Sequence, residues 1–180
     1  MSGDSTTFDA DQLRALLTRV GALATQRGTE LELVAMGGAA IALLFGARRV
    51  TRDIDVVQVR PSREVLAELA GAVAREDGLP ERWLSDNAAH FAPVVSIGPL
   101  LFEAPGVRVH AVAFEQLLAS KLDAMRDDVD RADAVTVAVH LGMARTSLEL
   151  AIAPFLRPER YARACEELED IWQEIEDARG

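Results

Sequence analysis

Hydrophobic residues recur every three or four positions from Leu13 onward, and this spacing predicts an amphipathic helix with one face in the core. Asp9 and Gln12 stand three residues apart just before this run and form the signature of a capping box. Phe8 is placed to pack on Leu13, and Gly28 supplies a C-terminal stop. The first predicted helix therefore has local signals at both ends.

The pattern then alternates between strand-like and helix-like runs. Residues 31–36 predict a strand, residues 39–46 a short buried helix, and residues 53–59 a second strand. Ser62 is a suitable N-cap for a helix over residues 63–77. Alternating strands and helices are typical of an α/β fold.

The second half of the chain changes from strands to helices. Residues 79–93 predict a loop with one helical turn, followed by short strands at 94–98, 100–104 and 107–113. From Phe114 onward every hydrophobic run has helical spacing. The order of elements thus predicts a sheet region followed by a helical region.

Capping signals subdivide the helical region. Asp130 is a natural N-cap for the helix that follows it, and Thr146 with Glu149 has the spacing of a capping box for the next one. The whole pattern predicts an α/β fold with a small mixed β-sheet flanked by helices over residues 1–113. A helical C-terminal region over residues 114–180 is expected to complete it.

Composition and charge limit the classes of protein. The chain has 180 residues, of which 49% are hydrophobic, enough to bury a sizeable core. Its single cysteine, Cys165, excludes a disulfide framework, and residues 1–13 lack a signal-peptide pattern, so we expect a reducing cytoplasm. No hydrophobic run approaches the length of a membrane span, so we expect no membrane partner. The net charge of −10 disfavours broad, non-specific nucleic-acid binding but does not exclude a local basic patch.

The stretch MGGAAIALLFGARRVTRDIDVV, residues 36–57, carries the candidate chemistry. Asp53 and Asp55 alternate with Ile54 in an otherwise aliphatic strand, so both carboxylates are expected to point the same way. Two carboxylates so close repel each other and stay ionised together only with a cation or strong donors between them. Mg²⁺ prefers oxygen ligands and takes one or two carboxylates with water and substrate phosphate. The pair indicates either a metal site or a solvated strand face.

Gly37 and Gly38 lie between the predicted first strand and the short helix. Without Cβ atoms their backbone can approach a ligand closely, and the amides at a helix start favour an anion, although a double glycine is more often only a turn. In combination with the carboxylate pair, phosphate-binding amides meet the requirement for nucleotidyl transfer. Thr51 shares the face of the carboxylates, so its hydroxyl is a candidate for binding phosphate or water.

GGAAIALLFGARRVTRDIDVV resembles the first motif of the nucleotidyltransferase superfamily: a Gly-Gly or Gly-Ser pair, a helix, then Asp-x-Asp. The variant Thr-x-Asp-Ile-Asp is similar to the AbiEii-like branch, found among toxins of bacterial toxin–antitoxin and abortive-infection systems. VRVHAVAFEQLLASKLDAMRDDVDRAD and WLSDNAAHF are similar to later segments of that branch, so the resemblance covers most of residues 31–141. It implies a nucleotidyltransferase fold and Mg²⁺-dependent transfer of an NMP from an NTP to a hydroxyl of tRNA or protein, by a toxin that a partner antitoxin restrains.

The resemblance implies a role for each residue of the first motif. Asp53 and Asp55 would hold Mg²⁺, while Gly37 and Gly38 would cradle the phosphates of the NTP. Many members of the superfamily have a third carboxylate on a later strand. Glu103 is the acidic residue of the strand region available for that role, and it equally suits a turn before Ala-Pro-Gly.

The second region supplies the remaining candidates. The resemblance implies that Lys121 neutralises charge on the triphosphate and that Arg126, one turn on, assists it. Spacing alone also fits a lysine that extends to solvent from a half-buried helix. Asp130 or Asp133, with Asp127 as an alternative, would orient or deprotonate the acceptor.

Arg48 and Arg49 lie between the short helix and the second strand, where they would contact nucleotide or RNA, or remain ordinary solvated charges. Two other functions remain open beside the enzyme. One is a catalytically inactive, nucleotide-binding member that acts through a protein partner. The other is a purely structural α/β domain, in which replacing the aspartates changes no metal binding.

Overall fold

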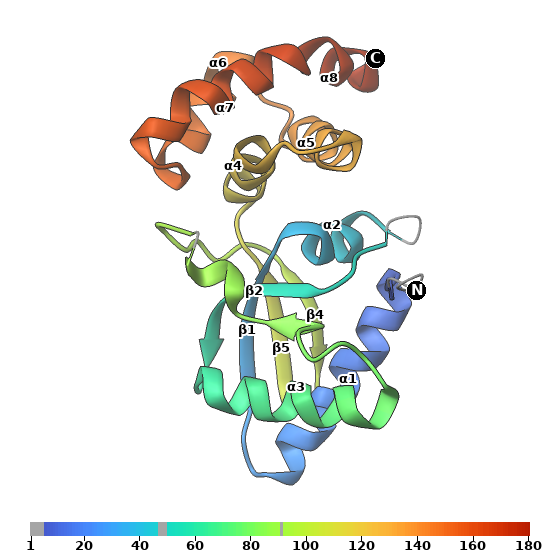
Figure 1. Cartoon of the computed structure of the whole chain (residues 1–180). Coiled ribbons are helices and arrows are strands. Elements are labelled where there is room, and N and C mark those ends of the chain that lie inside the picture. The colour runs from blue at the N-terminus through green and yellow to red at the C-terminus, as the bar shows by residue number, and fades with distance from the viewer. Residues whose placement is uncertain (1–5, 47–49, 91) are drawn as a thin grey trace, which may run out of the picture. The chain divides into compact units, whose positions relative to one another are not determined.

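The chain is an α/β protein with a five-stranded mixed sheet flanked by helices. The computed structural model describes residues 6–46, 50–90 and 92–180 (Figure 1). Arg48 and Arg49, which the sequence places as candidates for nucleotide or RNA contact, fall outside the described residues.

Two compact units make up the chain. Unit 1 consists of Met1–Phe91 and Ile97–Ala111, and it contains the sheet. Unit 2 consists of Ala92–Ser96 and Val112–Gly180, and it is helical. Each unit buries its own set of aliphatic side chains.

The strands of unit 1 are β1 (Leu31–Met36), β2 (Ile54–Arg60), β3 (Leu84–Ser85), β4 (Leu100–Ala104) and β5 (Val107–Ala111). They lie in the order β3-β2-β1-β5-β4. β1 is parallel to β5 and antiparallel to β2, β2 is parallel to β3, and β4 is antiparallel to β5. The mixed sheet expected from the alternating pattern is therefore present.

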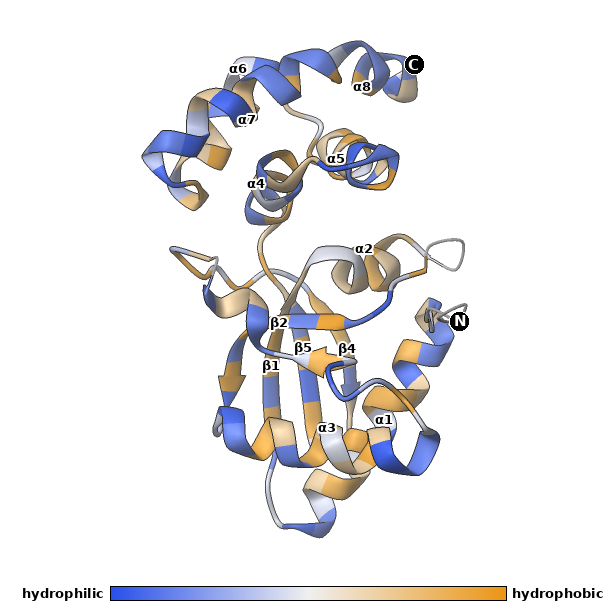
Figure 2. Ribbon diagram, in the orientation of Figure 1, coloured by the Kyte–Doolittle hydropathy of each residue, from blue (hydrophilic) through white to orange (hydrophobic). Residues whose placement is uncertain are grey.

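The helices of unit 1 are α1 (Ala10–Gln26), α2 (Gly37–Phe45), α3 (Arg63–Asp77) and the 3₁₀ turn η1 (Asn87–His90). α1 and α3 pack on each other and on the sheet, with their hydrophobic sides inward (Figure 2). The capping box of Asp9 and Gln12 and the N-cap Ser62 are confirmed, because each cap side chain accepts a backbone N–H of its helix. Local signals therefore fix the two helices that cover the sheet.

A β-bulge sets the register of β2. Val34 pairs with Gln58 but Ala35 pairs with Val56, so Val57 is the extra residue. Val56 and Val57 are consequently both buried, and the strict alternation expected for this strand does not hold. Beyond the bulge Asp55 lies opposite Met36.

The stretch 94–98 is not a strand, contrary to the sequence prediction. The backbone N–H of Gly98 donates to the O of Ala111 in β5 at 2.8 Å, but Val94 and Ser96 pair with the buried side chain of Gln116. Gln116 Oε1 accepts the backbone N–H of Ser96 at 2.8 Å, and Gln116 Nε2 donates to the backbone O of Val94 at 2.6 Å. The loop expected over 79–93 contains the short strand β3, which pairs with the start of β2.

Unit 2 contains α4 (Phe114–Ala124), α5 (Asp128–Leu141), α6 (Arg145–Ile152), η2 (Ala153–Phe155), α7 (Pro158–Asp170) and α8 (Trp172–Arg179). α4 is the central helix, since it packs on α5, α6 and α7. Its residues Leu117, Leu118 and Leu122 are fully buried. The prediction that everything after Phe114 is helical is confirmed.

Two predicted caps in unit 2 are wrong. α5 begins at Asp128 with Asp127 as its N-cap, so Asp130 lies inside the helix rather than capping it. α6 begins at Arg145 after Ala144 and has no side-chain cap, so Thr146 and Glu149 do not form a capping box. In both cases the helix starts earlier than the local signal indicates, and in α5 the side chain of Asp130 pairs with Lys121 instead of capping the helix.

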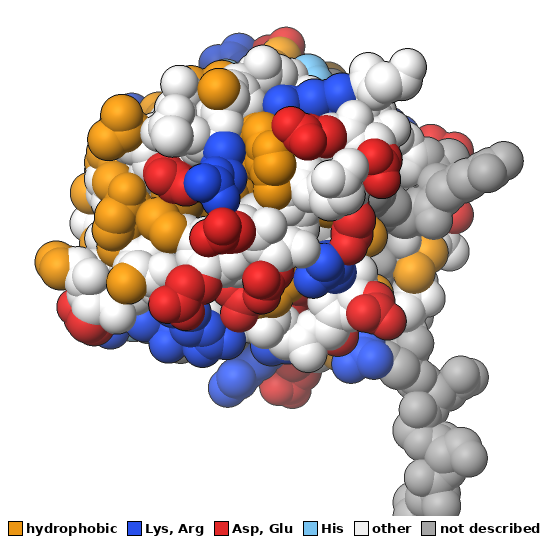
Figure 3. Space-filling view, turned by 90° about the horizontal axis from the view of Figure 1, so that it is seen from above, with side chains coloured by type: hydrophobic (Ala, Val, Ile, Leu, Met, Phe, Trp, Pro, Cys, Tyr) orange, Lys and Arg blue, Asp and Glu red, His pale blue; other side chains and the backbone are white. Residues whose placement is uncertain are grey.

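The face that carries the C-terminal helices mixes acidic and basic side chains, with hydrophobic side chains gathered to one side (Figure 3). Over the described residues of this face no continuous patch of Lys and Arg forms. Among the described residues, no single helix has the length and hydropathy to span a membrane. The bent pair Asp128–Leu141 and Arg145–Phe155 meets those criteria only when both helices are counted together across a 107° bend.

Candidate functional site

The first candidate residues lie where β1 ends and α2 begins. Gly37 and Gly38 are the first two residues of α2, so their amides are among the donors that a helix start leaves without a partner inside the helix. Met36 is the N-cap, and its side chain makes no capping hydrogen bond. Gly37 has a φ of +74°, a conformation that a side chain would strain. The helix start thus offers amides to an anion without a competing side-chain cap.

Thr51 lies directly against Gly38. A Cβ atom on Gly38 would lie 2.9 Å from Thr51 Oγ1 and 3.4 Å from Thr51 Cβ, so a larger residue would displace the threonine. Thr51 Oγ1 in turn donates a hydrogen bond to the backbone O of Asp53 at 3.1 Å. The threonine therefore connects the start of α2 to the segment that carries the carboxylates.

The two aspartates lie at the start of β2. Asp53 immediately precedes the strand and is exposed, whereas Asp55 is its second residue and is half-buried. Asp55 pairs with Met36 of β1 on one side and with Ser85 of β3 on the other. Since Met36 directly precedes Gly37, the sheet sets Asp55 beside the start of α2. The candidates of the first motif thus gather in one part of unit 1.

The donor atoms in this part of unit 1 are oxygens: two carboxylates and a threonine hydroxyl. Hard divalent cations prefer such ligands, and Mg²⁺ needs only one or two carboxylates when water and phosphate complete its shell. Over the described ranges no group of three or more His, Cys, Asp or Glu side chains is arranged to hold a metal ion. Two carboxylates and a hydroxyl are oxygen ligands of the kind that suit Mg²⁺ when water and phosphate complete its shell.

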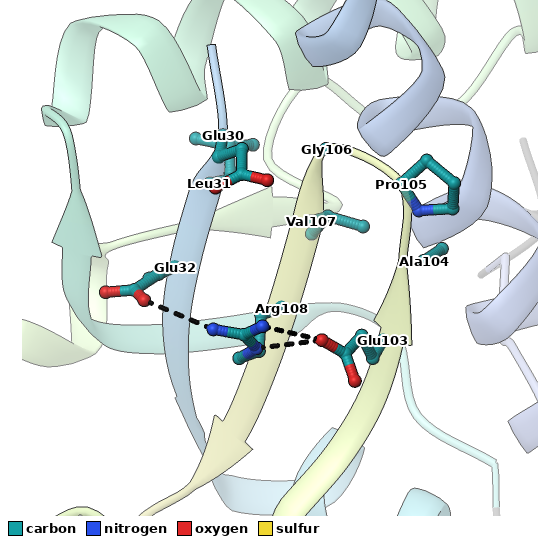
Figure 4. A pocket seen from close by; sticks show the side chains of 9 residues that line it. All are labelled: Glu30, Leu31, Glu32, Glu103, Ala104, Pro105, Gly106, Val107 and Arg108. Carbon is teal, nitrogen blue, oxygen red and sulfur yellow. Dashed lines mark hydrogen bonds and ion pairs between the residues drawn. The ribbon is translucent and has the colours of Figure 1, made fainter.

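Glu103 lies at the other end of the sheet. Glu103 pairs with Arg108 of β5, and Arg108 pairs in turn with Glu32 of β1. Glu32 lies four residues before Met36, which is roughly 13 Å along the strand. Arg108 donates to Glu103 Oε1 at 2.7 Å and lies 3.6 Å from Glu32, beside a hollow of about 380 Å³ (Figure 4). The hydrogen bond to Glu103 raises the pKa of Arg108. Glu103 thus belongs to a surface ion pair and lies far along the sheet from Asp55.

Three candidates of the second region form one buried cluster in unit 2. Lys121 Nζ lies 2.9 Å from Asp130 Oδ1 and 2.8 Å from Asp133 Oδ2. Only 9% of the Lys121 side chain is exposed, and the two carboxylates are buried to a similar degree. Lys121 is therefore enclosed between the two aspartates, and it does not extend to solvent.

Arg126 and Asp127 lie at the edge of this cluster. Arg126 Nε is 3.0 Å from Asp130 Oδ2, yet 75% of the arginine side chain is exposed. Burial alone would raise the pKa of Asp130, but hydrogen bonds from Arg126 and Lys121 outweigh it and lower that pKa. Asp127 serves as the N-cap of α5, accepting the N–H groups of Val129 and Asp130. Arg126 thus reaches solvent, whereas Lys121 does not.

The candidate residues therefore form two clusters, one in each unit. No family model, no curated protein and no solved structure matches the chain.

Two residues near the first cluster have no local signal in the sequence. Phe8, expected only to pack on Leu13, pairs with the backbone of Thr51. The backbone O of Trp83 accepts the N–H of Ile54 at 2.7 Å. Both partners come from distant parts of the chain, and pairing across that separation is set by the fold rather than by spacing.

Proposed function

We propose that this protein is a Mg²⁺-dependent nucleotidyltransferase, with unit 1 as a nucleotidyltransferase fold that binds the Mg²⁺–NTP complex. The observation that carries the proposal is the conjunction at the start of α2. Uncapped amides of Gly37 and Gly38 adjoin Thr51, and Asp53 and Asp55 begin the neighbouring strand. A phosphate chain and a hard cation are the ligands that such a set of groups recognises together.

Each group has a separate task. The amides of Gly37 and Gly38 donate hydrogen bonds to phosphate oxygens, and the hydroxyl of Thr51 is placed to orient phosphate or water. Asp53 and Asp55 hold Mg²⁺, which when bound supplies Lewis-acid polarisation of the phosphates. Binding the cation also relieves the repulsion between the two carboxylates.

The reaction forms a bond between the acceptor hydroxyl oxygen and the α-phosphorus of the NTP. The bond from that phosphorus to the bridging oxygen breaks, pyrophosphate leaves, and the hydroxyl proton passes to a base or to water. The resemblance assigns acceptor orientation or deprotonation to Asp130 or Asp133, and charge neutralisation to Lys121 and Arg126. Both carboxylates are buried and pair with Lys121, and the lowered pKa of Asp130 makes it a weak base, so neither aspartate is well suited to remove a proton.

A transfer assay tests the proposal. Each NTP, labelled at the α-phosphate, is incubated with Mg²⁺ and the protein in the presence of tRNA or of protein, the two acceptor classes that the resemblance implies. We expect label to enter one acceptor with release of pyrophosphate. Asp55→Asn should reduce transfer by about 100-fold or more.

Glu103→Gln is the matched control, since it removes a carboxylate from the same sheet at the distant ion pair. It should leave transfer within about threefold of wild type, a difference of under 1 kcal/mol in the barrier. Absence of transfer with every NTP and acceptor would contradict the proposal that the protein is a nucleotidyltransferase. NTP binding without turnover would instead support the inactive, nucleotide-binding alternative that acts through a protein partner.

A further inference from the structure

The segment 51–54 carries Thr51 and Asp53 but stands outside regular secondary structure until β2 begins at Ile54. A ligand site needs such a segment in one geometry, because ordering it only at binding would cost conformational entropy. The isolated bridge at Thr51 and the first bond of the β2–β3 pairing at Ile54 therefore have to hold it.

Two residues hold the segment through its backbone. The N–H of Phe8 donates to the O of Thr51 at 2.6 Å, and the N–H of Thr51 donates to the O of Phe8 at 2.9 Å. At the other end the N–H of Ile54 donates to the O of Trp83 at 2.7 Å. Both ends of the segment are thus hydrogen-bonded to partners from outside it.

These two partners are themselves firmly anchored. Phe8 is 3% exposed and Trp83 is fully buried, and their rings pack edge-on with centroids 6.4 Å apart. Trp83 Nε1 donates to the backbone O of Ala70 on α3 at 3.0 Å. Phe8 precedes Asp9, whose capping box fixes the start of α1. The two aromatic residues therefore connect the segment to both helices that cover the sheet.

We propose that Phe8 and Trp83 are positioning residues, which hold the segment 51–54 in the geometry that binds the Mg²⁺–NTP complex; this inference rests on the proposed function. Neither side chain has to touch the ligand. Their effect passes through backbone hydrogen bonds to Thr51 and Ile54, and a displacement of about 1 Å at a site can cost up to 100-fold in activity.

The test separates positioning from general stability. Phe8→Ala removes the buried ring, and Leu17→Ala is the matched control, because it truncates a fully buried residue of α1 that makes no hydrogen bond to the segment. Two properties are measured at a temperature where circular dichroism shows every variant folded. They are the Kd for each Mg²⁺–NTP by calorimetry, and hydrogen exchange of the amides of Thr51 and Ile54 without ligand.

We expect Phe8→Ala to weaken Mg²⁺–NTP binding about tenfold and to speed exchange of the Thr51 and Ile54 amides. Leu17→Ala should change neither, although it lowers the melting temperature. Phe8→Leu, which keeps a large buried side chain, should restore most of the affinity. If Phe8→Ala does not fold, Trp83→Phe replaces it, since it keeps a ring in place but removes the bond to Ala70.

Equal affinity and equal amide protection in Phe8→Ala and wild type would overturn the inference while leaving the proposed function intact. So would an affinity loss in Leu17→Ala as large as that in Phe8→Ala. Failure of wild type to bind any Mg²⁺–NTP would overturn the proposed function and this inference together.

Discussion

At the scale of single residues, the ammonium of Lys121 has two buried carboxylates as partners, Asp130 and Asp133. Removing charges from water costs several kcal/mol per ion, and that cost is offset only while each partner is present. If Lys121 moved to an external phosphate, the buried negative charges of both aspartates would lose their positive partner. Its position therefore favours a supporting role, in which it fixes Asp130, and Asp130 in turn fixes the exposed Arg126.

Asp130→Asn should lower the free energy of unfolding by about 3 kcal/mol at pH 7, because it leaves buried positive charge less well paired. The folded-state pKa of Asp130 lies below its ordinary value, so its stabilisation is present above about pH 4. It is lost as the pH falls through the lowered pKa. The difference between wild type and variant should therefore shrink below about pH 4, as measured by urea unfolding across the pH range.

Asp123→Asn is the control for this effect. Asp123 pairs with Arg160 in the same unit, but both side chains are 39% exposed. Such a pair contributes about 0–1 kcal/mol, so this variant should differ little from wild type. A loss for Asp130→Asn no larger than that for Asp123→Asn would show that the buried cluster is not a stabilising unit.

At the scale of elements, the ends of the helices in unit 2 are set by contacts that are distant in sequence. Asp130 has the composition of an N-cap but is drawn into the buried cluster with Lys121, and Asp127 caps α5 instead. Thr146 and Glu149 have the spacing of a capping box, yet α6 starts at Arg145. Tertiary pairing with Lys121 explains the first departure, whereas Glu149 pairs with Arg145 of its own helix.

Asp127→Ala should therefore cost about 1 kcal/mol of unfolding free energy, because it removes the acceptor for two backbone N–H groups at the start of α5. Thr146→Ala should cost less than about 0.5 kcal/mol, since Thr146 caps nothing. Chemical unfolding of the two variants at neutral pH measures the difference. A reversed order of the two costs would contradict the helix boundaries.

The elements that the sequence predicts well are those with local signals. α1 and α3 have their caps, their periodic leucines and their glycine stops within a few residues. The bulge at Val57, the strand β3 and the binding of 94–96 to Gln116 have no such signal. Their conformations depend on partners that only the assembled fold brings close, so spacing alone does not predict them.

At the scale of the whole molecule, the candidate residues named from the sequence fall into two clusters in separate units. The first motif could be assembled from the sequence because strand, helix and strand follow one another directly. The burial of Lys121 could not be predicted from the sequence, because how deeply a helix is buried depends on the elements that pack against it. The backbone hydrogen bonds of Phe8 to Thr51 and of Trp83 to Ile54 could not be predicted either, because these partners are far apart in the sequence.

Charge also acts at this scale. The net charge is −10, and charges of both signs mix on the face of the C-terminal helices (Figure 3). Binding to a polyanion in general is therefore disfavoured. If tRNA is the acceptor, its recognition has to rest on specific contacts, and a protein acceptor has no such requirement.

The most direct measurement is thermal melting with each NTP, with and without Mg²⁺, on wild type and on Asp53→Ala/Asp55→Ala. A ligand present at about 100 times its Kd stabilises the folded state by about 2.7 kcal/mol, or roughly 5–10 °C for a chain of this size. Wild type should show such a shift with at least one NTP, only when Mg²⁺ is present, and the double variant should show none. Glu166→Gln/Glu176→Gln, which removes two exposed carboxylates of unit 2, should keep the shift. An unchanged melting temperature of wild type with every NTP at millimolar concentration, or an equal shift in Asp53→Ala/Asp55→Ala, would contradict a Mg²⁺–NTP site in unit 1.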